Sequence, residues 1–341
     1  MTVSRNPATP RSRARRSWSR AVVIPTAVVL LAVLASLAVG SEALAAREVF
    51  LALFVDDGGR ARVIVHELRV PRTLLAASVG AALGIAGALM QSLTRNPLAD
   101  PGILGVNAGA AAGVAGAVVL LGLRDYSSYV WFAFLGAGVT AVLVYAIGTA
   151  GASPVRLALA GTAIGAALTA ATQSLVLLRP DAFDEFRFWA VGDLAGRDPA
   201  VVRTMIPFLL VGLVLALAVA SSLNTLVLGD DVSRALGSRA GATRAVVALA
   251  VLLLSGAATA AAGPIAFVGL VVPHIARSLL GSDHRWSLPG AGLLGAALVL
   301  VADVLGRVVL PHGELQVGLV VTVVGAPFFI ALVRHRRMPR L

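Results

Sequence analysis

The stretch RVPRTLLAASVGAALGIAGALMQSLTRNPLADPGILG, residues 69–105, carries the pattern that decides the fold. Its apolar run, from about residue 73 to 93, has about twenty residues and is long enough to cross a bilayer as a helix. Pro97 pushes the residue before it out of the helical conformation, so the run ends at a turn. Asp100 followed by Pro101 is typical of the cap and first residue of a new helix. The stretch therefore predicts two membrane-spanning helices joined by a short polar turn.

Small residues recur at four-residue spacing in both of these predicted helices. Gly80 and Gly84 lie in the first helix, and Gly109 and Gly113 lie in the second. Glycines at this spacing share one face of a helix and let two backbones approach closely. Helix packing is the simplest interpretation, and a hinge or gate at the connecting turn is the alternative that spacing leaves open.

The composition extends this pattern to the whole chain. Of its 341 residues 58% are hydrophobic and only 13% are charged, with a mean hydropathy of +0.90, whereas soluble domains carry about 25% charged residues. Continuous apolar runs predict an all-α polytopic membrane protein, because a transmembrane barrel would show short alternating segments. We expect about ten transmembrane helices, near residues 21–40, 73–93, 102–122, 129–149, 155–178 and 201–222, then 245–262, one starting at 264, 289–310 and 314–333.

Ten spans place both ends of the chain on the same side of the membrane. Arginines cluster before the first span and after the last, which predicts cytoplasmic N- and C-termini. We divide the chain into a disordered basic tail at 1–20, a ten-helix domain at 21–337 with a cytoplasmic loop at 226–244, and a C-terminal tail at 338–341. The first apolar run is long for a cleavable signal peptide, so we expect it to remain as a span.

Two polar segments between the spans predict short helices. In the first segment, aromatic residues with helical spacing lie among acidic ones, as in an amphipathic helix at a membrane surface; they are Phe183, Phe186 and Trp189. In the second segment, Asp230 or Asp231 can cap a helix of one or two turns, and Gly237 can end it.

The sequence contains no constellation typical of an enzyme or a metal site. It has no cysteine, and its five histidines lack metal-ligand spacing. It has no lysine, so it cannot form a phosphate-binding loop of the G-x-x-x-x-G-K-[ST] type. We therefore expect no catalytic site, no bound cofactor and no metal, with any ATP and Mg²⁺ held by a separate subunit. In a membrane protein, a net charge of +11 indicates topology and not nucleic-acid binding.

Ionisable residues and prolines inside the spans are few. Asp303 and Arg307 lie one helical turn apart, which fits either an i,i+4 ion pair or an arginine facing an acidic ligand or partner. Gly263 and Pro264 break one helix and start the next. Pro273 has no N–H group, so the carbonyl four residues earlier loses its helical partner.

Five segments of the chain form a recognisable set: RVPR at 69–72, NPLADP at 96–101, LG through ALG at 228–237, GPIAFVGLVVPHIAR at 263–277 and GAPF at 325–328. These segments resemble those of the FecCD family, the permease subunits of ABC importers for iron–siderophore complexes and vitamin B12. They follow the family order over about residues 45–337.

The resemblance implies a ten-span permease in which spans 2–5 and 7–10 form an inverted repeat. Its implied partners are a second permease subunit, identical or related, two ATP-binding subunits, an extracytoplasmic substrate-binding protein or lipoprotein, and membrane lipid, with no nucleic acid. The implied function is translocation of ferric siderophore across the cytoplasmic membrane by alternating access. A cobalamin or haem importer is the alternative, and an ion-driven transporter is less favoured because the spans lack mid-membrane acids.

The resemblance also implies roles for individual residues. Those expected to dock the binding protein are Arg69, Arg72 and Arg307, for which the alternative is an anchoring role at helix ends. Those expected to form the cytoplasmic gate are Asn96, Leu98, Ala152 and Ser153. Those expected to couple to the ATPase are Gly229, Asp230, Asp231, Ser233, Arg234, Ala235, Leu236 and Gly237, for which the alternative is an ordinary solvated loop. Those expected to form a helix hinge are Gly263, Pro264 and Pro273.

Overall fold

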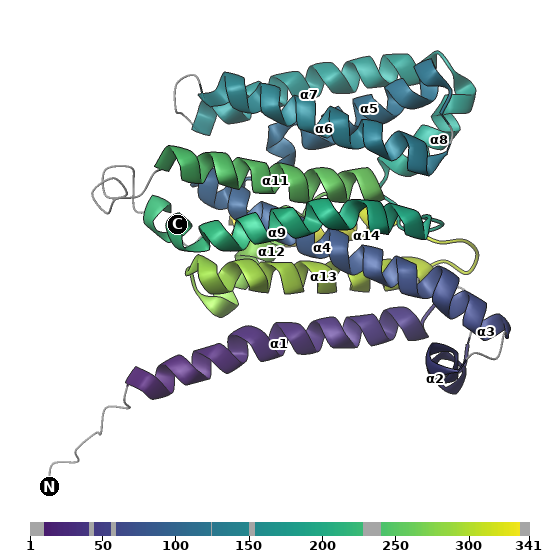
Figure 1. Ribbon diagram of the computed structural model, residues 1–341, viewed down its shortest axis with the longest axis horizontal. Helices are drawn as coiled ribbons and strands as arrows, with labels where there is room; N and C mark the ends of the chain where they lie inside the picture. Colours follow the sequence, from purple (N-terminus) through teal and green to yellow (C-terminus); the bar gives the residue numbers. More distant parts are fainter. Residues whose placement is uncertain are drawn as a thin grey trace, which may run out of the picture.

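The computed structural model describes residues 10–40, 44–55, 59–123, 125–149, 154–227 and 240–334, and within these ranges the secondary structure is helical. The helices lie roughly side by side in one bundle (Figure 1). The longer ones are α1 (Pro10–Ala38), α4 (Val70–Thr94), α5 (Val106–Leu121), α6 (Tyr126–Thr149), α7 (Pro154–Leu177), α9 (Pro199–Val227), α11 (Ala240–Ala262), α12 (Val268–Leu280), α13 (His284–Val308) and α14 (Val317–Arg334). The shorter ones are α2 (Ala46–Phe54), α3 (Arg60–Val63), the π-helical segment η1 (Ile64–Arg69), the 3₁₀ turn η2 (Pro101–Leu104) and α8 (Pro180–Ala190).

The ten longer helices correspond in order to the ten expected spans. Among the described residues, six helical segments are long and apolar enough to cross a membrane: Arg60–Thr94, Ser128–Ile147, Arg156–Leu177, Pro199–Leu226, Ala240–Ala262 and His284–Val308. Four apolar helices are shorter: Val23–Ala38, Val106–Leu121, Val268–Leu280 and Val317–Ala331. The predicted all-α polytopic membrane fold is therefore confirmed.

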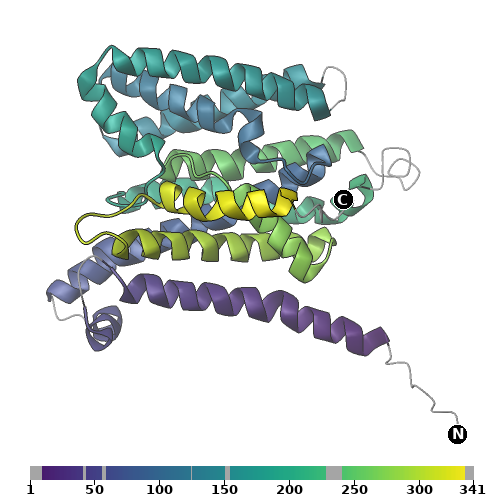
Figure 2. The ribbon, with the colours of Figure 1, turned by 180° about the vertical axis from the view of Figure 1, so that it is seen from behind.

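The connections between helices gather at the two ends of the bundle. The start of α1, the end of α9, the start of α11 and the end of α14 lie at one end, which we call the α9 end (Figures 1 and 2). The helices α2 and α8 lie at the opposite end, which we call the α8 end. Both described ends of the chain are therefore on the same side, as an even number of spans requires.

The helix α4 lies at the centre of the bundle. It packs against α13, α12 and α11, whereas α1 covers one edge and α5, α6 and α7 form the other (Figure 1). In a repeat of spans 2–5 and 7–10, α4 corresponds to α11, α5 to α12 and α6 to α13. The contact of α4 with α13 then has its counterpart in that of α11 with α6, and the contact of α4 with α12 in that of α11 with α5. This matching of contacts is what an inverted repeat of spans 2–5 and 7–10 produces.

The glycines spaced by four residues lie where helices touch backbone to backbone. A side-chain carbon at Gly80 would collide with the carbonyl of Gly295, and one at Gly84 with the carbonyl of Ala291, both on α13. In the same way, Gly109 and Gly113 face the backbone of α6. The interpretation of these glycines as packing residues is confirmed.

Three helix boundaries differ from those expected. The helix α1 begins at Pro10, so residues 10–20 continue the first helix in place of a disordered tail. Between α4 and α5, η2 and a left-handed Gly105 precede the helix expected to start at about residue 102. After α11 the backbone stays non-helical over residues 263–267, and α12 begins at Val268. Such non-helical segments occur at membrane depth only where protein or a water-filled cavity surrounds them.

The short amphipathic helix predicted around residue 186 is α8, but it is only partly a surface element. Phe183 is exposed and Phe186 is half-buried, whereas Trp189 is only 1% exposed. The carbonyl of Trp189 lies against Gly263, and the next turn contacts Pro264 through Gly192. The helix α8 is therefore fixed to the break that follows α11.

Candidate functional site

Two buried arginines hold the end of α1 at the α8 end of the bundle. Arg69 donates to the carbonyls of Leu37 at 2.7 Å and Ala38 at 2.9 Å. Arg307 donates to the carbonyl of Ser36 at 2.8 Å and to that of Val39 at 3.2 Å. The last carbonyls of a helix have no partner within the helix, and positive charge is favourable there. Both arginines are only 4% exposed, so they act as a cap on α1.

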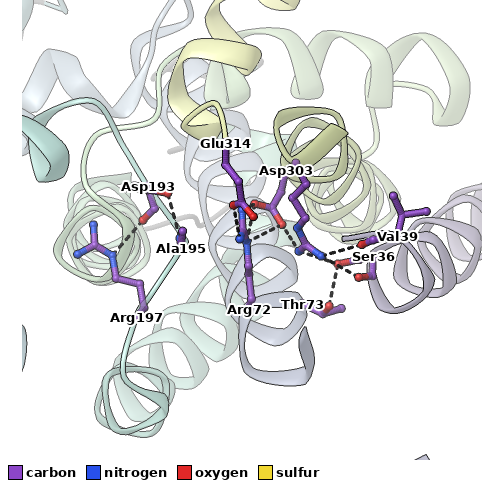
Figure 3. Close-up of polar contacts among 10 residues, drawn as sticks. Ser36, Val39, Arg72, Thr73, Asp193, Ala195, Arg197, Asp303 and Glu314 are labelled. Atoms are coloured by element: carbon purple, nitrogen blue, oxygen red, sulfur yellow. Dashed lines mark hydrogen bonds and ion pairs between the residues drawn. The ribbon is translucent and has the colours of Figure 1, made fainter. Parts of the chain in front are cut away.

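Arg72, the third of the arginines expected to dock the binding protein, forms an ion-pair cluster with two acidic residues. Its guanidinium donates to the Asp303 carboxylate through Nε and through Nη2 at 2.8 Å, and to Glu314 through Nη1 at 2.7 Å (Figure 3). Asp303 also pairs with Arg307, so the predicted i,i+4 pair is present and buried. One carboxylate thus joins two arginines from two helices.

The cluster borders a cavity of about 270 Å³ at the α8 end. Its lining includes Arg69, Arg72, Arg307, Glu314, Glu67 and Arg197. The side chains of Arg72 and Glu314 are 14% and 23% exposed, against 1% for Asp303, so they lie nearer its opening. Arg197 is positioned by a hydrogen bond from its Nε to the carbonyl of Asp193 (Figure 3). The cavity therefore presents cationic groups to any acidic side chain that enters it.

The turn between α4 and η2 has the predicted cap. Arg95 ends α4 in the left-handed conformation with φ 50°, and Asn96 accepts a hydrogen bond from the N–H of Leu98 at 3.0 Å. Asp100 then accepts from the N–H of Gly102 at 2.8 Å, with Pro101 at the first position of η2. Burial raises the pKa of Asp100, although its hydrogen bond with Gly102 opposes that shift. The cap is confirmed. The two expected gate residues on this turn are Asn96, which is exposed, and Leu98, which is half-buried.

The carbonyl released by Pro273 is bonded by a neighbouring helix. Gln91 on α4 donates through Nε2 to the carbonyls of Gly269 and Leu270, both at 3.2 Å, and its Oε1 accepts from Arg277 at 2.5 Å. Gln91 is fully buried. Because Gly87 on α4 has no side chain, the two backbones touch beside this amide at Gly269. The kink in α12 is therefore stabilised from α4.

An open groove of about 460 Å³ runs along the edge of the bundle between α5, η2 and α7. Small and uncharged polar residues line it: Gly102, Gly105, Asn107, Ala108, Ala111, Gly161, Thr162, Gly165, Ala166 and Thr169. Thr162 and Thr169 are exposed, although they lie in a span. The groove offers hydroxyl and amide groups without a charge.

Part of the expected site lies outside the described residues. This concerns two expected gate residues, Ala152 and Ser153, and all of the expected coupling residues: Gly229, Asp230, Asp231, Ser233, Arg234, Ala235, Leu236 and Gly237. The expected hinge residues Gly263 and Pro264 lie in the break after α11, and Pro273 lies inside α12. Within the part of the chain that is described, no group of three or more histidine, aspartate or glutamate residues is placed to hold a metal ion.

Some residues of these sites were not predicted. Gln91 and Glu314 form hydrogen bonds or ion pairs with residues 178 to 242 positions away. A polar residue inside an apolar run was the available signal for Gln91, because a buried amide needs partners.

Comparison with known proteins identifies the family. The model of the FecCD transport family matches residues 28–335. The chain therefore belongs to the FecCD transport family.

Individual relatives match over most of their length. The ferric enterobactin transport system permease protein FepD of Escherichia coli (strain K12) is 45% identical, over 93% of this chain and 96% of the relative's length. The Fe(3+)-citrate import system permease protein YfmD of Bacillus subtilis (strain 168) is 41% identical, over 96% of this chain and 98% of the relative's length. A metal-chelate type ABC transporter solved in an inward-facing conformation is 26% identical, with a TM-score of 0.81 over 93% of this chain and 99% of that one.

Proposed function

We propose that this chain is the permease subunit of an ABC importer that carries ferric siderophore across the cytoplasmic membrane by alternating access. Its family and the relatives that act on ferric enterobactin and ferric citrate support this assignment. The single structural observation that carries it is the uncharged groove along α5, η2 and α7. A cobalamin or haem importer remains the alternative substrate class.

The groove fits one wall of a translocation pathway. Polar side chains in a membrane span avoid lipid and face protein or water. Thr162 and Thr169 are exposed on α7, a helix at the edge of the bundle, so we infer that a second permease subunit faces them across a water-filled pathway. Uncharged walls would bind a large chelate weakly, and weak binding allows release on the far side.

The partners follow from the two ends of the bundle. We place the ATP-binding subunits at the α9 end, where residues 229–237 would couple to them, and the substrate-binding protein at the α8 end. There Arg72 is the most exposed of the three expected docking arginines, so an acidic side chain of the binding protein would meet Arg72 before Arg69 or Arg307. In the cycle we propose, ATP binding moves the coupling segment, the break at Gly263 flexes and the gate turn opens.

The assignment is tested by uptake of radiolabelled ferric enterobactin in cells with and without this gene, with labelled cobalamin in parallel. We expect iron uptake to be lost without the gene and cobalamin uptake to stay. The opposite pattern would move the chain to the alternative substrate class. Uptake that resists vanadate would contradict an ATP-driven mechanism.

A pair of matched substitutions on α7 tests the pathway itself. Ala166 lines the groove, whereas Ala171 is exposed on the opposite side of the same helix. We expect Ala166→Trp to abolish most uptake by filling the groove and Ala171→Trp to preserve it. Equal uptake in the two variants, at equal membrane abundance, would remove the groove from the pathway.

A further inference from the structure

At the α9 end, the last turn of α9 is bonded to the start of α13. The amide of Asn224 donates through Nδ2 to the Asp283 carboxylate at 2.7 Å, and its Oδ1 accepts from the backbone N–H of His284 at 3.0 Å. A carboxylate can only accept here, so the amide orientation is fixed and Oδ1 faces His284. The Nδ1 atom of His284 lies 2.7 Å from that oxygen and therefore carries the hydrogen.

The other nitrogen of His284 reaches the centre of the bundle. Its Nε2 lies 2.6 Å from the hydroxyl of Ser92 near the end of α4. His284 and Ser92 are 5% and 1% exposed, so water does not compete for this bond. Asn224, which is half-buried, and the buried His284 and Ser92 therefore form a chain of hydrogen-bonded groups that joins α9, α13 and α4, and we call it the His284 link.

A second contact joins the same two helix ends. Arg95, which ends α4, donates through Nη2 to the carbonyl of Leu226 at 2.9 Å. Arg95 is also the first residue of the turn at residues 95–100, which we call the gate turn because it contains the expected gate residues Asn96 and Leu98. The end of α9 is thus joined to α4 directly at Arg95 and, through His284 of α13, at Ser92, so the two links lie on either side of the point where α4 stops being helical.

Asp283 supports this arrangement from outside the spans. Burial raises the pKa of its carboxyl group, but the hydrogen bonds from the Arg285 N–H and from Asn224 lower that pKa overall. Asp283 is therefore ionised at neutral pH, caps α13 and holds the Asn224 amide in place.

We propose that the His284 link, together with the Arg95–Leu226 contact, transmits displacement of the end of α9 to the gate turn at residues 95–100. This inference rests on the proposed function, in which the segment after α9 receives the motion of the ATPase. Buried hydrogen-bonded groups are displaced as a unit, because separating them would leave polar groups unpaired. Asn224, His284 and Ser92 are then positioning residues that couple ATP hydrolysis to opening.

A purely structural brace would give a different result from a coupling link. Loss of a brace lowers the stability or the amount of assembled complex, and transport and ATP hydrolysis fall together. Loss of a coupling link leaves hydrolysis running while transport falls. The number of ATP molecules hydrolysed per ligand transported therefore separates the two.

The test uses the complete complex of permease, ATP-binding subunits and binding protein in lipid vesicles, with radiolabelled ferric enterobactin as the ligand. We expect Asn224→Ala to raise the ATP hydrolysed per ligand transported about fivefold, the factor appropriate to one lost hydrogen-bonded contact. Ser92→Ala, which removes only a hydroxyl group, should raise the ratio in the same direction and serves if the first variant assembles poorly.

Ser221→Ala is the matched control. Ser221 lies one turn earlier on α9 and accepts a hydrogen bond from Arg285 of α13 at 2.8 Å, but it does not reach α4. We expect its ratio to equal that of the wild type. A wild-type ratio in both Asn224→Ala and Ser92→Ala, with transport intact, would overturn the link. Absence of ATP-dependent uptake in the wild type would instead overturn the proposed function on which the link depends.

Discussion

The two ends of α4 are fixed by different chemistry. At the α8 end, Arg69 binds the last carbonyls of α1, and Arg72 binds the carboxylates of Asp303 and Glu314, so the contacts are made by charged groups. At the α9 end, Gln91 and Ser92 use an amide and a hydroxyl group. One helix thus carries a charged anchor at one end and mainly neutral hydrogen bonds at the other.

This difference indicates which end can rearrange. Removing one partner from a buried ion pair costs several kcal/mol, so such a cluster persists through a cycle or changes only when new charges arrive. A neutral hydrogen bond contributes only about 1 kcal/mol, so the α9 end is held less strongly than the α8 end. We expect the α9 end to move during transport, with the His284 link displaced as a unit, and the α8 end to respond to an acidic partner.

The largest expected effect comes from breaking the charged end. Asp303→Asn leaves Arg72 and Arg307 without their shared carboxylate at a site that is 1% exposed. We expect a loss of about 3–5 kcal/mol in the free energy of unfolding, measured by thermal or denaturant unfolding in detergent.

Glu314→Gln is the control for that variant. It removes the same kind of charge from Arg72, but at a side chain that is 23% exposed. We expect a loss below about 1 kcal/mol. Equal losses in the two variants would show that burial does not distinguish the two carboxylates.

A smaller effect is expected from the neutral end. Gln91→Leu keeps the approximate volume but leaves the carbonyls of Gly269 and Leu270 and the guanidinium of Arg277 without this partner. We expect a loss of about 2–3 kcal/mol in the free energy of unfolding. Gln173→Leu, at an exposed amide on α7, should leave it unchanged. If Gln91→Leu were as stable as the wild type, other groups would have to form hydrogen bonds with the carbonyls at the kink of α12.

A still smaller effect than that of Gln91→Leu is expected at the turn of residues 95–100. Asp100→Ala removes the cap of η2 and should cost about 1 kcal/mol of unfolding free energy, whereas Asp100→Asn keeps a capping oxygen. Burial raises the pKa of Asp100 in the folded protein above its ordinary value of 3.8. At a pH above 3.8 the unfolded chain therefore ionises at Asp100 more readily than the folded protein does, so this ionisation opposes folding. We therefore expect Asp100→Asn to melt at or above the wild-type temperature at pH 7, and a lower melting temperature would contradict the assigned shift.

Features set by local sequence could be predicted, and features set by distant contacts could not. The cap at Asp100, the close packing at Gly80 and the unpaired carbonyl created by Pro273 all follow from a few neighbouring residues. The cap that Arg69 and Arg307 place on α1 joins positions 32 to 271 residues apart, and such pairs have no local pattern. The docking role implied for these arginines stays a prediction, and it now has to account for the bonds they already make.

The break after α11 shows the same limit. Gly263 and Pro264 correctly mark where α11 ends, but they do not indicate that five residues stay non-helical before α12. The extension depends on packing against Trp189 and Gly192 near α8, which lie far away in the sequence.

The contact between Gly87 and Gly269 gives α4 the geometry of a lever. With no side chain between the two backbones, the point of contact can serve as a fulcrum about which α4, together with the helix α13 packed on it at Gly80 and Gly84, tilts against α12. At a rise of about 1.5 Å per residue, the arm toward Thr94 is roughly 10 Å and the arm toward Val70 roughly 26 Å. A tilt that shifts the short arm is therefore amplified more than twofold at the far tip, where the cationic cavity lies. A small displacement of α4 at one side of the membrane would therefore produce a larger displacement of α4 at the other side.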